Sequence, residues 1–471
     1  MARSRRRFSP PLHLPWLCIC CLLLSPAASS PVAVTRLPGF DGPLPFSLET
    51  GYVEVDESTG VHLFYYFVES EKDPARDPLV LWLQGGPGCS GLSGLLFEIG
   101  PFRFDVEGYR GGFPTLLYRP ETWTKVSNVI FVDSPIGSGF SYATSEEGLI
   151  SSDTMAVKKL VIFLKKWLHE HPQFLSNPLY VGGESYCGII IPTLALEIHI
   201  SNKESGEEPL LNLNGYFAGN PVTDDRFDTA GKIQFFHGMG MLSDELYEFA
   251  KENCGGNYSN PSNALCAESI QAIEDCTKDI NLSHILEPKC EAVWSPRIQQ
   301  ATARNGTSEL TVGYPAGDDL LFPFKCRSDA QQLSYIWAND EGVRESLGIR
   351  KGTKGEWKRC ERDLPYTRDV TSAVEIHLRL RREGYPALIY SGDHDSKVPF
   401  VATQAWIRSL NLSITDDWRP WYVDGQVAGF TRSYSTDLTY ATVKGAGHTA
   451  PEFKPKECLE MLARWLSGDP L

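Results

Sequence analysis

The feature that most constrains this sequence is a serine that stands between a strand pattern and a helix pattern. The β-rich run Leu179-Tyr-Val leads through Gly-Gly183-Glu-Ser185-Tyr-Cys187 into a helix-like run of apolar residues. This order is typical of a nucleophile elbow, where a strained turn lifts the serine hydroxyl clear of a sheet. Strand and helix pass close together there, so small residues are needed two before and two after the serine, as Gly183 and Cys187 are. A bare turn is the alternative, but the flanking patterns favour Ser185 as a nucleophile.

Five β-rich runs, that before Ser185 among them, predict a mostly parallel sheet. They are Leu79–Leu83, Val129–Val132, Leu179–Val181, Ala387–Tyr390 and Thr439–Val443, and Gly51–Ser70 alternates like a hairpin. An amphipathic helix is expected over Ser152–Glu170 because its apolar residues recur at helical spacing. Strands that alternate with helices indicate an α/β fold with helices on both faces of the sheet. Residues 220–345 break this rhythm and are interpreted as an insertion or cap over the sheet.

A serine nucleophile needs a base, and the base needs a carboxylate that orients it. In the α/β-hydrolase arrangement these residues follow in the order serine, acid, histidine. The loop Ser-Gly-Asp393-His394-Asp395 follows one strand run, and Lys-Gly-Ala-Gly-His448 follows the last one. We expect Asp393 as the acid and His448 as the base. Asp395 is the rival acid, and His394 is a second candidate base that adjoins the acid.

A glycine-rich turn directly after Leu79–Leu83 offers donors for an oxyanion. It reads Gln84-Gly-Gly86-Pro-Gly-Cys-Ser, and the backbone amides of Gly86 and Tyr186 are the expected pair. The turn lacks the Gly-Lys-Ser/Thr ending of a phosphate loop. The sequence His169-Glu-His171 also lacks the four-residue histidine spacing of a metalloprotease helix. No metal or nucleotide cofactor is therefore expected.

The first 30 residues predict a secretory signal peptide. Arginines at 3, 5, 6 and 7 precede an apolar stretch over Leu12–Leu24, and the small residues Ala27–Ser30 offer a cleavage site. The apolar stretch is short for a membrane span, contains His13 and Pro15 and directly follows Pro11, which favours cleavage over a membrane anchor. We expect residues 31–471 to form a single secreted domain.

Composition agrees with secretion and excludes one partner class. The net charge is −15, and it is near −19 without the four arginines of the signal. An acidic chain repels phosphate backbones, so nucleic-acid binding is not expected. Nine cysteines remain after the signal, an odd number, so at least one thiol is free. Glycosylation sequons are present at Asn257, Asn281, Asn305 and Asn411.

Taken together, these motifs resemble the serine carboxypeptidase family from about Leu37 to the C-terminus. The resemblance implies an α/β-hydrolase fold with a disulfide-stapled insertion and a Ser185–Asp393–His448 triad. It also implies an oxyanion hole of Gly86 and Tyr186. The disulfides that it implies are Cys89–Cys360, Cys254–Cys266 and Cys290–Cys326, which leave Cys187, Cys276 and Cys458 unpaired. Cleavage into two polypeptides within residues 290–325 is consistent with this family.

The family contains two chemistries that differ in what resolves the acyl-enzyme. Peptidase members bind the terminal carboxylate of the substrate through an Asn in the glycine-rich turn and the Glu before the serine. This chain keeps Glu184 but has Gln84 at the Asn position, one methylene longer. A displacement of order 1 Å costs about a hundredfold where positioning governs the rate. We expect substrate contacts from Gln84, Gly85 and Glu184, with exopeptidase activity weakened.

Other segments are similar to the plant acyltransferase branch, which uses 1-O-glucose esters as acyl donors. They begin at Pro43, Leu48, Gly219, Phe236, Ser243, Gln404, Asp416 and Asp424. That branch commonly has Asp where Glu184 stands, so the pattern is mixed. The favoured hypothesis is transfer of an acyl group to an alcohol in secondary metabolism. A serine carboxypeptidase and, more weakly, a decayed binding protein are the alternatives.

The remaining expectations concern the acyl pocket and the compartment. Phe235, Phe236 and Tyr247 are candidates for lining an apolar acyl pocket, although ordinary core packing is the favoured interpretation for any single one of them. The compartment is the vacuole or the extracellular space. The expected partners are a small-molecule glucose ester and an alcohol, or a peptide C-terminus, with no nucleic acid and no membrane after cleavage.

Overall fold

Strand β4 (Leu79–Leu83) lies in the middle of a large sheet and shows how the core is divided. All five of its residues are buried. The first, third and fifth pack into one apolar cluster, whereas the second and fourth pack into another. Successive side chains of a strand point to opposite faces, so β4 has an apolar layer on each side. Burial on both faces is the environment that a parallel α/β sheet requires.

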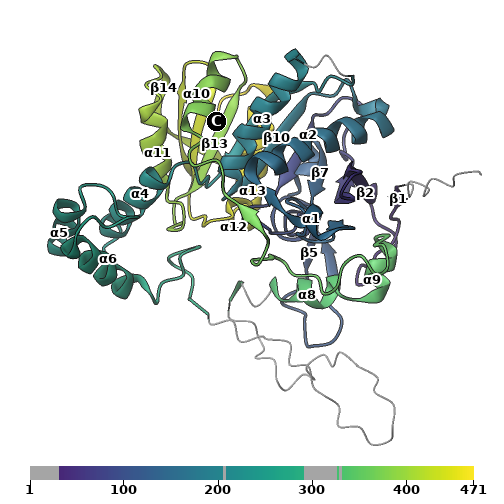
Figure 1. Ribbon diagram of the computed structural model, residues 1–471, viewed down its shortest axis with the longest axis horizontal. Helices are drawn as coiled ribbons and strands as arrows, with labels where there is room; N and C mark the ends of the chain where they lie inside the picture. Colours follow the sequence, from purple (N-terminus) through teal and green to yellow (C-terminus); the bar gives the residue numbers. More distant parts are fainter. Residues whose placement is uncertain (1–30, 205–207, 291–325, 328–330) are drawn as a thin grey trace, which may run out of the picture. The chain divides into compact units, whose positions relative to one another are not determined.

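The computed structural model describes residues 31–204, 208–290, 326–327 and 331–471 (Figure 1). The predicted signal peptide, the Asn305 sequon and residues 291–325, where cleavage is expected, lie outside the described residues. The sheet follows the order β1-β2-β3-β7-β4-β10-β11-β13-β16-β15-β14, and β8 pairs with β3.

Six strands in the centre of this sheet run parallel, as the sequence predicts. They are β4, β7 (Asn128–Val132), β10 (Leu179–Glu184), β11 (Leu213–Gly219), β13 (Ala387–Gly392) and β16 (Leu438–Val443). The sequence runs locate every one of these strands except β11. Parallel strands bring their carboxyl ends to one edge, where α/β sheets place their sites.

Antiparallel strands extend the sheet on both sides. They are β1 (Val32–Ala33), β2 (Leu48–Asp56), β3 (Val61–Val68), β8 (Tyr142–Ala143), β14 (Ile414–Val423) and β15 (Gln426–Tyr434). The pair β2–β3 is the predicted hairpin. Two small sheets pair β5 (Phe102–Phe104) with β6 (Leu116–Tyr118) and β9 (Ser151–Ser152) with β12 (Tyr366–Thr367).

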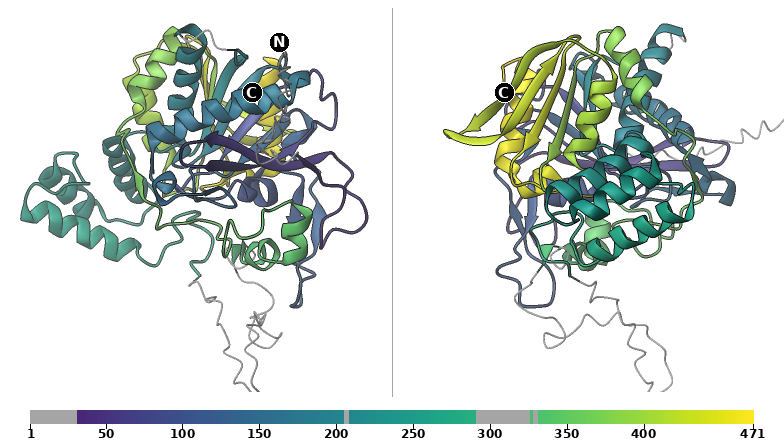
Figure 2. Two further views of the ribbon diagram at one scale, coloured as in Figure 1. Left: turned by 45° about the vertical axis from the view of Figure 1, so that its right-hand side comes forward. Right: turned by 90° about the vertical axis from the view of Figure 1, so that its left-hand side faces the viewer.

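Helices cover both faces of the sheet (Figures 1 and 2). One apolar cluster includes α2 (Asp153–Glu170), α3 (Cys187–Glu204), α10 (Val374–Arg382) and α11 (Phe400–Ser409). The other includes the π-helical turn η1 (Gly94–Glu98), α8 (Leu333–Ala338), α9 (Glu341–Ser346), α12 (Ala450–Phe453) and α13 (Pro455–Ser467). Short turns are α1 (Glu146–Leu149), η2 (Trp123–Lys125) and η3 (Pro172–Phe174).

Helix α2 is the predicted amphipathic helix, and its ends follow from local chemistry. The side chain of Ser152 caps the first turn by accepting a hydrogen bond from the backbone N–H of Met155. The apolar stripe is buried against the sheet. The helix ends at Glu170, two residues before Pro172, since proline cannot continue a helix.

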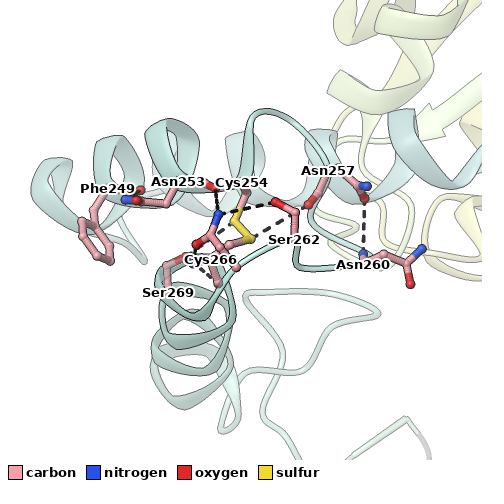
Figure 3. The surroundings of a disulfide bond; sticks show 9 residues. Phe249, Asn253, Cys254, Asn257, Asn260, Ser262, Cys266 and Ser269 are labelled. Carbon is pink, nitrogen blue, oxygen red and sulfur yellow. Dashed lines mark hydrogen bonds between the residues drawn. A yellow bond between two sulfur atoms is a disulfide. The ribbon is translucent and has the colours of Figure 1, made fainter.

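The region interpreted as an insertion contains helices with a small core of their own. Helices α4 (Asp225–Gly238), α5 (Asp244–Cys254) and α6 (Ala264–Thr277) follow β11, and α5 and α6 lie side by side (Figure 2). The Cys254–Cys266 disulfide joins the end of α5 to the start of α6 (Figure 3). Asn263 caps α6 by accepting a hydrogen bond from the backbone N–H of Cys266, at 2.9 Å.

Candidate active site

Ser185 lies in a sharp turn between β10 and α3. Its φ is +63°, a left-handed conformation that a non-glycine residue adopts at a cost of order 1–3 kcal/mol. A Cβ added at Gly183 would lie 2.6 Å from the carbonyl oxygen of Leu83 and 2.8 Å from Cβ of Cys187. Only glycine therefore fits at position 183, and a small residue suits position 187. This is the local geometry of a nucleophile elbow.

Three polar side chains form a continuous hydrogen-bonded chain at this turn. Oγ of Ser185 lies 2.8 Å from Nε2 of His448, and Nδ1 of His448 lies 2.8 Å from Oδ2 of Asp395. A neutral imidazole that donates from Nδ1 to the carboxylate accepts the serine proton at Nε2. The loop after β16 places His448, whose backbone N–H donates to the carbonyl of Ser283 at 2.7 Å.

The structure corrects the predicted acid, because Asp395 and not Asp393 contacts His448. The backbone N–H of Asp393 still bonds to Val443, the last residue of β16, whereas His448 lies five residues further along that loop. The carboxylate that reaches the ring is therefore two residues beyond the one that directly follows β13. Asp395 is fully buried, and Nδ2 of Asn220 donates to its Oδ2 at 2.8 Å.

Asp393 instead forms a hydrogen bond with the loop that contains His448. Its Oδ1 accepts a hydrogen bond from the backbone N–H of Gly445 at 2.7 Å and lies 2.5 Å from Nδ1 of His394. The ring of His394 stacks on that of His284, with centroids 5.3 Å apart. No contact of His394 with Ser185 is present among the described residues, so the structure gives His394 no role as the base.

The glycine-rich turn after β4 lies directly against the nucleophile. A Cβ at Gly85 would lie 2.7 Å from Cβ of Ser185 and 3.1 Å from the backbone nitrogen of Tyr186. The backbone N–H groups of Gly86 and Tyr186 donate no hydrogen bond within the described part of the chain. Both groups are therefore free to receive an oxyanion that forms at the serine.

Tyr186 is held by a buried carboxylate that the sequence analysis did not single out. Its hydroxyl donates to Oδ1 of Asp153 at 2.8 Å, and the hydroxyl of Tyr366 donates to the same oxygen, also at 2.8 Å. Burial and Asp153 both raise the pKa of the Tyr186 phenol, so the hydroxyl stays a donor. The guanidinium of Arg368 lies over the Tyr186 ring, 5.0 Å from its centroid.

The expected substrate contacts Gln84 and Glu184 belong to a buried cluster that contains a second carboxyl group, Glu98. Nε2 of Gln84 donates to Oε1 of Glu98 at 2.7 Å. Oε1 of Glu184 accepts a hydrogen bond from Tyr390 at 3.0 Å, and its Oε2 has no partner among the described residues. The sequence signal for Glu98 is one acid in the apolar run Gly-Leu-Leu-Phe-Glu98-Ile.

Burial controls the charge of this carboxyl pair. It raises the pKa of Glu98 to about 7, and the neighbouring charge of Glu452 acts in the same direction. Burial also raises the pKa of Glu184 well above its ordinary value, with Glu98 as the next cause. Desolvation disfavours the ionised form of each carboxyl group. At mildly acidic pH the cluster is therefore protonated and can donate hydrogen bonds.

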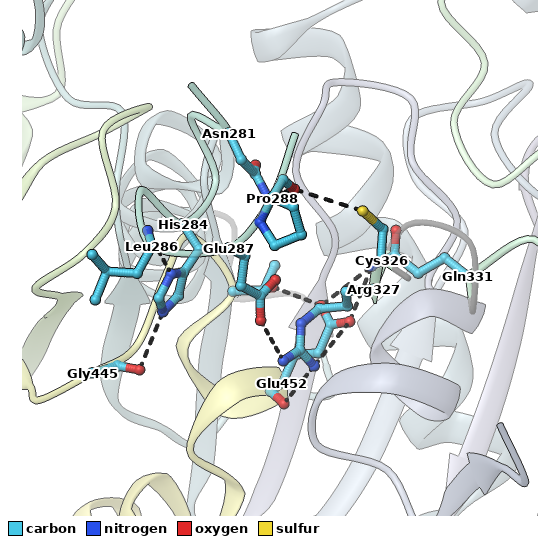
Figure 4. A network of polar contacts seen from close by, with 11 residues as sticks. Asn281, His284, Leu286, Glu287, Pro288, Cys326, Arg327, Gln331, Gly445 and Glu452 are labelled. Atoms are coloured by element: carbon cyan, nitrogen blue, oxygen red, sulfur yellow. Dashed lines mark hydrogen bonds and ion pairs between the residues drawn. The ribbon is translucent and has the colours of Figure 1, made fainter. Parts of the chain in front are cut away.

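A cavity of about 710 Å³ opens in front of Ser185 and His448. Segment Asn281–Lys289 forms one wall, and Arg327 ties it to α12 (Figure 4). Nη2 of Arg327 lies 2.9 Å from Oε1 of Glu287, and its guanidinium lies 4.2 Å from the ring centroid of Phe453. The volume is in the range of small-molecule sites.

The predicted acyl-pocket aromatics do not line this cavity. Phe235 and Phe236 are buried in the small core of α4, α5 and α6, and Tyr247 stacks on His237 with ring centroids 4.1 Å apart. The alternative of ordinary packing is therefore correct for the two phenylalanines.

All three implied disulfides are present: Cys89–Cys360, Cys254–Cys266 and Cys290–Cys326. Cys187, Cys276 and Cys458 are free. The described sequons are Asn257, Asn281 and Asn411, and Asn281 lies at the cavity. Glycosylation at these sites remains a prediction.

The described residues contain no cluster of His, Cys, Asp or Glu suited to a metal ion. No helix within them has the length and apolar character needed to cross a membrane.

Comparison with known proteins agrees with this geometry. The model of the serine carboxypeptidase family matches residues 38–468. Serine carboxypeptidase-like 19 of Arabidopsis thaliana is 47% identical over 93% of this chain and 94% of its own length. Serine carboxypeptidase-like 10 of the same plant is 48% identical over 96% of this chain and 97% of its own length.

A solved structure supports the fold. Kex1(delta)p, a prohormone-processing carboxypeptidase from Saccharomyces cerevisiae, superposes with a TM-score of 0.73 at 20% identity. The match covers 93% of this chain and 95% of that chain. The predicted α/β-hydrolase fold, with a mostly parallel sheet and helices on both faces, is confirmed. The chain belongs to the serine carboxypeptidase family and is a serine carboxypeptidase-like enzyme.

Proposed function

We propose that this enzyme transfers an acyl group from a 1-O-glucose ester to an alcohol through an acyl-enzyme on Ser185. The observation that carries the proposal is the hydrogen bond between the side chains of Gln84 and Glu98. Its amide is buried and donates to Glu98 at 2.7 Å, where peptidase members are expected to offer an Asn to the terminal carboxylate of a peptide. An amide held in this way is poorly placed to bind that carboxylate, which favours transfer over peptide hydrolysis.

The contacts at Ser185 support a complete catalytic cycle. His448 takes the serine proton as Oγ attacks the ester carbonyl, and Asp395 stabilises the imidazolium. The N–H groups of Gly86 and Tyr186 receive the oxyanion. His448 then returns the proton to the leaving glucose oxygen, and the acyl group stays on Ser185.

The second half of the cycle repeats these roles with an alcohol in place of the serine. His448 removes the hydroxyl proton of the acceptor, which attacks the acyl-enzyme, and the proton returns to Ser185. Transfer exceeds hydrolysis when the cavity positions the acceptor and keeps water from the ester.

Carboxypeptidase activity is the second candidate, and one observation favours it. Glu184 stands directly before the serine, and burial raises its pKa, so its carboxyl group is protonated at acidic pH. A protonated carboxyl group can donate a hydrogen bond to the terminal carboxylate of a peptide. Kex1(delta)p is a carboxypeptidase, but at 20% identity its similarity to this chain supports the fold alone.

The compartment proposed for this enzyme is the vacuole or the extracellular space. Its three disulfides support passage through an oxidising secretory pathway.

The test compares the wild-type enzyme with Ser185→Ala. Both are incubated with a hydroxycinnamoyl-glucose ester and mixed alcohols, and separately with a blocked dipeptide at about pH 5. The proposal expects new esters that are absent with the alanine variant. Release of the terminal amino acid without ester transfer would overturn it in favour of the peptidase.

A further inference from the structure

The strands that end the sheet carry aromatic side chains on the surface of the molecule. Trp418 and Phe430 are exposed on β14 and β15, the last pair of the sheet (Figure 1). Their rings lie nearly parallel, with centroids 5.7 Å apart and an interplanar angle of 6°. The ring of Tyr440, on β16, lies 6.1 Å from that of Trp418 at an angle of 25°. Three nearly parallel rings therefore gather at this end of the sheet.

A cavity of about 230 Å³ lies between these strands and α11. Its lining combines aromatic rings with amide and guanidinium groups, namely Gln404, Arg408, Trp418, Arg432, Tyr434 and Tyr440. Arg432 is held in place, since its Nη2 lies 2.7 Å from Oδ1 of Asp417 and its guanidinium lies 5.8 Å from the Trp418 ring centroid. The side chains of Gln404 and Arg408 have no partner within the described part of the chain, so both can donate hydrogen bonds to a ligand.

This combination of groups suits a sugar. The C–H groups on one face of a pyranose ring pack against an aromatic ring, as other apolar groups do. Its hydroxyl and N-acetyl oxygens accept hydrogen bonds from amide and guanidinium groups. A charged ligand fits less well, because Arg432 is already paired with Asp417 and much of the lining is aromatic.

A glycosylation sequon stands beside the cavity. Asn411-Leu-Ser follows α11, and Asn411 is exposed. The backbone N–H of Asn411 donates to the carbonyl of Arg408 at 3.1 Å, so Asn411 lies one turn beyond a residue that lines the cavity. Gln404 precedes Arg408 by four residues, a spacing that places both on one side of the helix. The chain then enters β14 at Ile414, which pairs with another lining residue, Tyr434. Asn411 is therefore flanked on both sides by the cavity.

We propose that this cavity receives the first sugars of an N-linked glycan attached to Asn411. The two N-acetylglucosamine residues that begin such a glycan lie along Gln404 and Arg408, and one of them packs against Trp418. The glycan then covers apolar surface that the fold leaves exposed and joins α11 to the last strands of the sheet. The proposal does not depend on the reaction at Ser185, since this cavity shares no residue with the one in front of Ser185.

Protection of the glycan from an endoglycosidase tests the contact. The full chain is secreted from a eukaryotic host, and the native protein is treated with an enzyme that cuts between the first two N-acetylglucosamine residues. Mass spectrometry of the peptide that contains Asn411 gives the rate. We expect release from the wild-type protein to be about tenfold slower than from Trp418→Ala, which one aromatic contact can account for.

Tyr422→Ala is the matched control for this experiment. Tyr422 is an aromatic residue on the same strand, is 48% exposed and does not line the cavity. Its variant should release the glycan at the wild-type rate. Equal rates in all three proteins, or an Asn411 that carries no glycan in the secreted protein, would overturn the proposal. Protection that is lost when the protein is diluted would also overturn it, because the glycan would then belong to another copy.

Thermal unfolding gives a second measurement that does not involve the endoglycosidase. Asn411→Gln removes the glycan, and we expect it to lower the Tm by about 1–3 °C in the wild-type and Tyr422→Ala backgrounds. In the Trp418→Ala background the same change should leave the Tm unaltered, since the contact is already lost. An equal drop in all three backgrounds would show that the glycan acts without Trp418, contrary to the proposal.

Discussion

The carboxylate of Asp395 lies 2.8 Å from Nδ1 of His448, although Asp393 is the aspartate that directly follows strand β13. The two aspartates make different contacts. Asp395 is fully buried against the imidazole, whereas Asp393 bonds to the backbone of Gly445 and to His394. Only Asp395 can stabilise the positive charge that develops on His448.

Substitution of each aspartate in turn should have a different effect on kcat. Asp395→Asn should lower kcat by about 10⁴-fold, because the amide favours the wrong imidazole tautomer. Asp393→Asn should lower kcat by less than about tenfold, since its loss loosens the Gly445 loop but leaves the His448 contact in place. Steady-state kinetics of both variants on one ester substrate measures the difference. Equal losses in the two variants would contradict the assignment of Asp395.

The buried carboxyl pair should make the protein less stable as the pH rises. Burial raises the pKa of Glu98 from 4.5 to about 7, so between these values the folded chain holds a proton that the unfolded chain releases. The free energy of unfolding therefore falls with pH across this range. Glu98→Gln removes this contribution, and the drop in Tm between about pH 5 and about pH 7.5 should shrink.

Thermal unfolding at the two pH values measures the Glu98 effect. Glu268→Gln, at an exposed position, is the control and should show the same drop in Tm as the wild-type protein. An unchanged drop in the Glu98 variant would show that the carboxyl group of Glu98 does not titrate as its burial implies.

The disulfides should differ in their effect on activity. Cys89–Cys360 spans 271 residues and fixes the oxyanion turn, whereas Cys254–Cys266 spans 12 residues in a helix pair that does not line the cavity. Removal of either bond by paired Cys→Ser changes should cost about 2–5 kcal/mol of stability. Only loss of Cys89–Cys360 should also lower kcat, measured well below both unfolding temperatures. A comparable loss of kcat in both double variants would refute this distinction.

Shortening Gln84 should shift the balance of the two chemistries. Gln84→Asn withdraws the amide by one methylene, so it no longer reaches Glu98 in the present geometry. We expect release of the terminal residue from a blocked dipeptide to rise at least about tenfold relative to ester transfer. Amino-acid release and ester formation are quantified together by mass spectrometry. A variant with an unchanged ratio would remove Gln84 as the residue that sets specificity.

Local pattern was sufficient to predict the central strands, α2 and the elbow at Ser185. These elements are set by short-range periodicity and by the need for small residues at Gly183 and Cys187, both of which are visible in sequence. The choice between Asp393 and Asp395 depends on how far the His448 loop runs past β16. That offset is a tertiary relationship between two strands and has no local signal.

Residues that act from a distance in sequence were also missed. Glu98 lies 14 residues from Gln84 in the sequence and Asp153 lies 33 residues from Tyr186, so both contacts depend on how separate elements pack. Phe235 and Phe236 belong to a small core, as ordinary packing predicts, and an apolar pattern alone does not distinguish such a core from a pocket. Packing between elements decides each of these cases.

The mass of the acyl-enzyme tests the role of Ser185 as nucleophile. The enzyme is mixed with a hydroxycinnamoyl-glucose ester without acceptor, quenched in acid and digested, and the peptide that contains Ser185 is examined by mass spectrometry. We expect an acyl group on Ser185 that is absent from Ser185→Ala and strongly reduced in His448→Ala. Product formation without an adduct on Ser185, or an adduct on another residue, would contradict it.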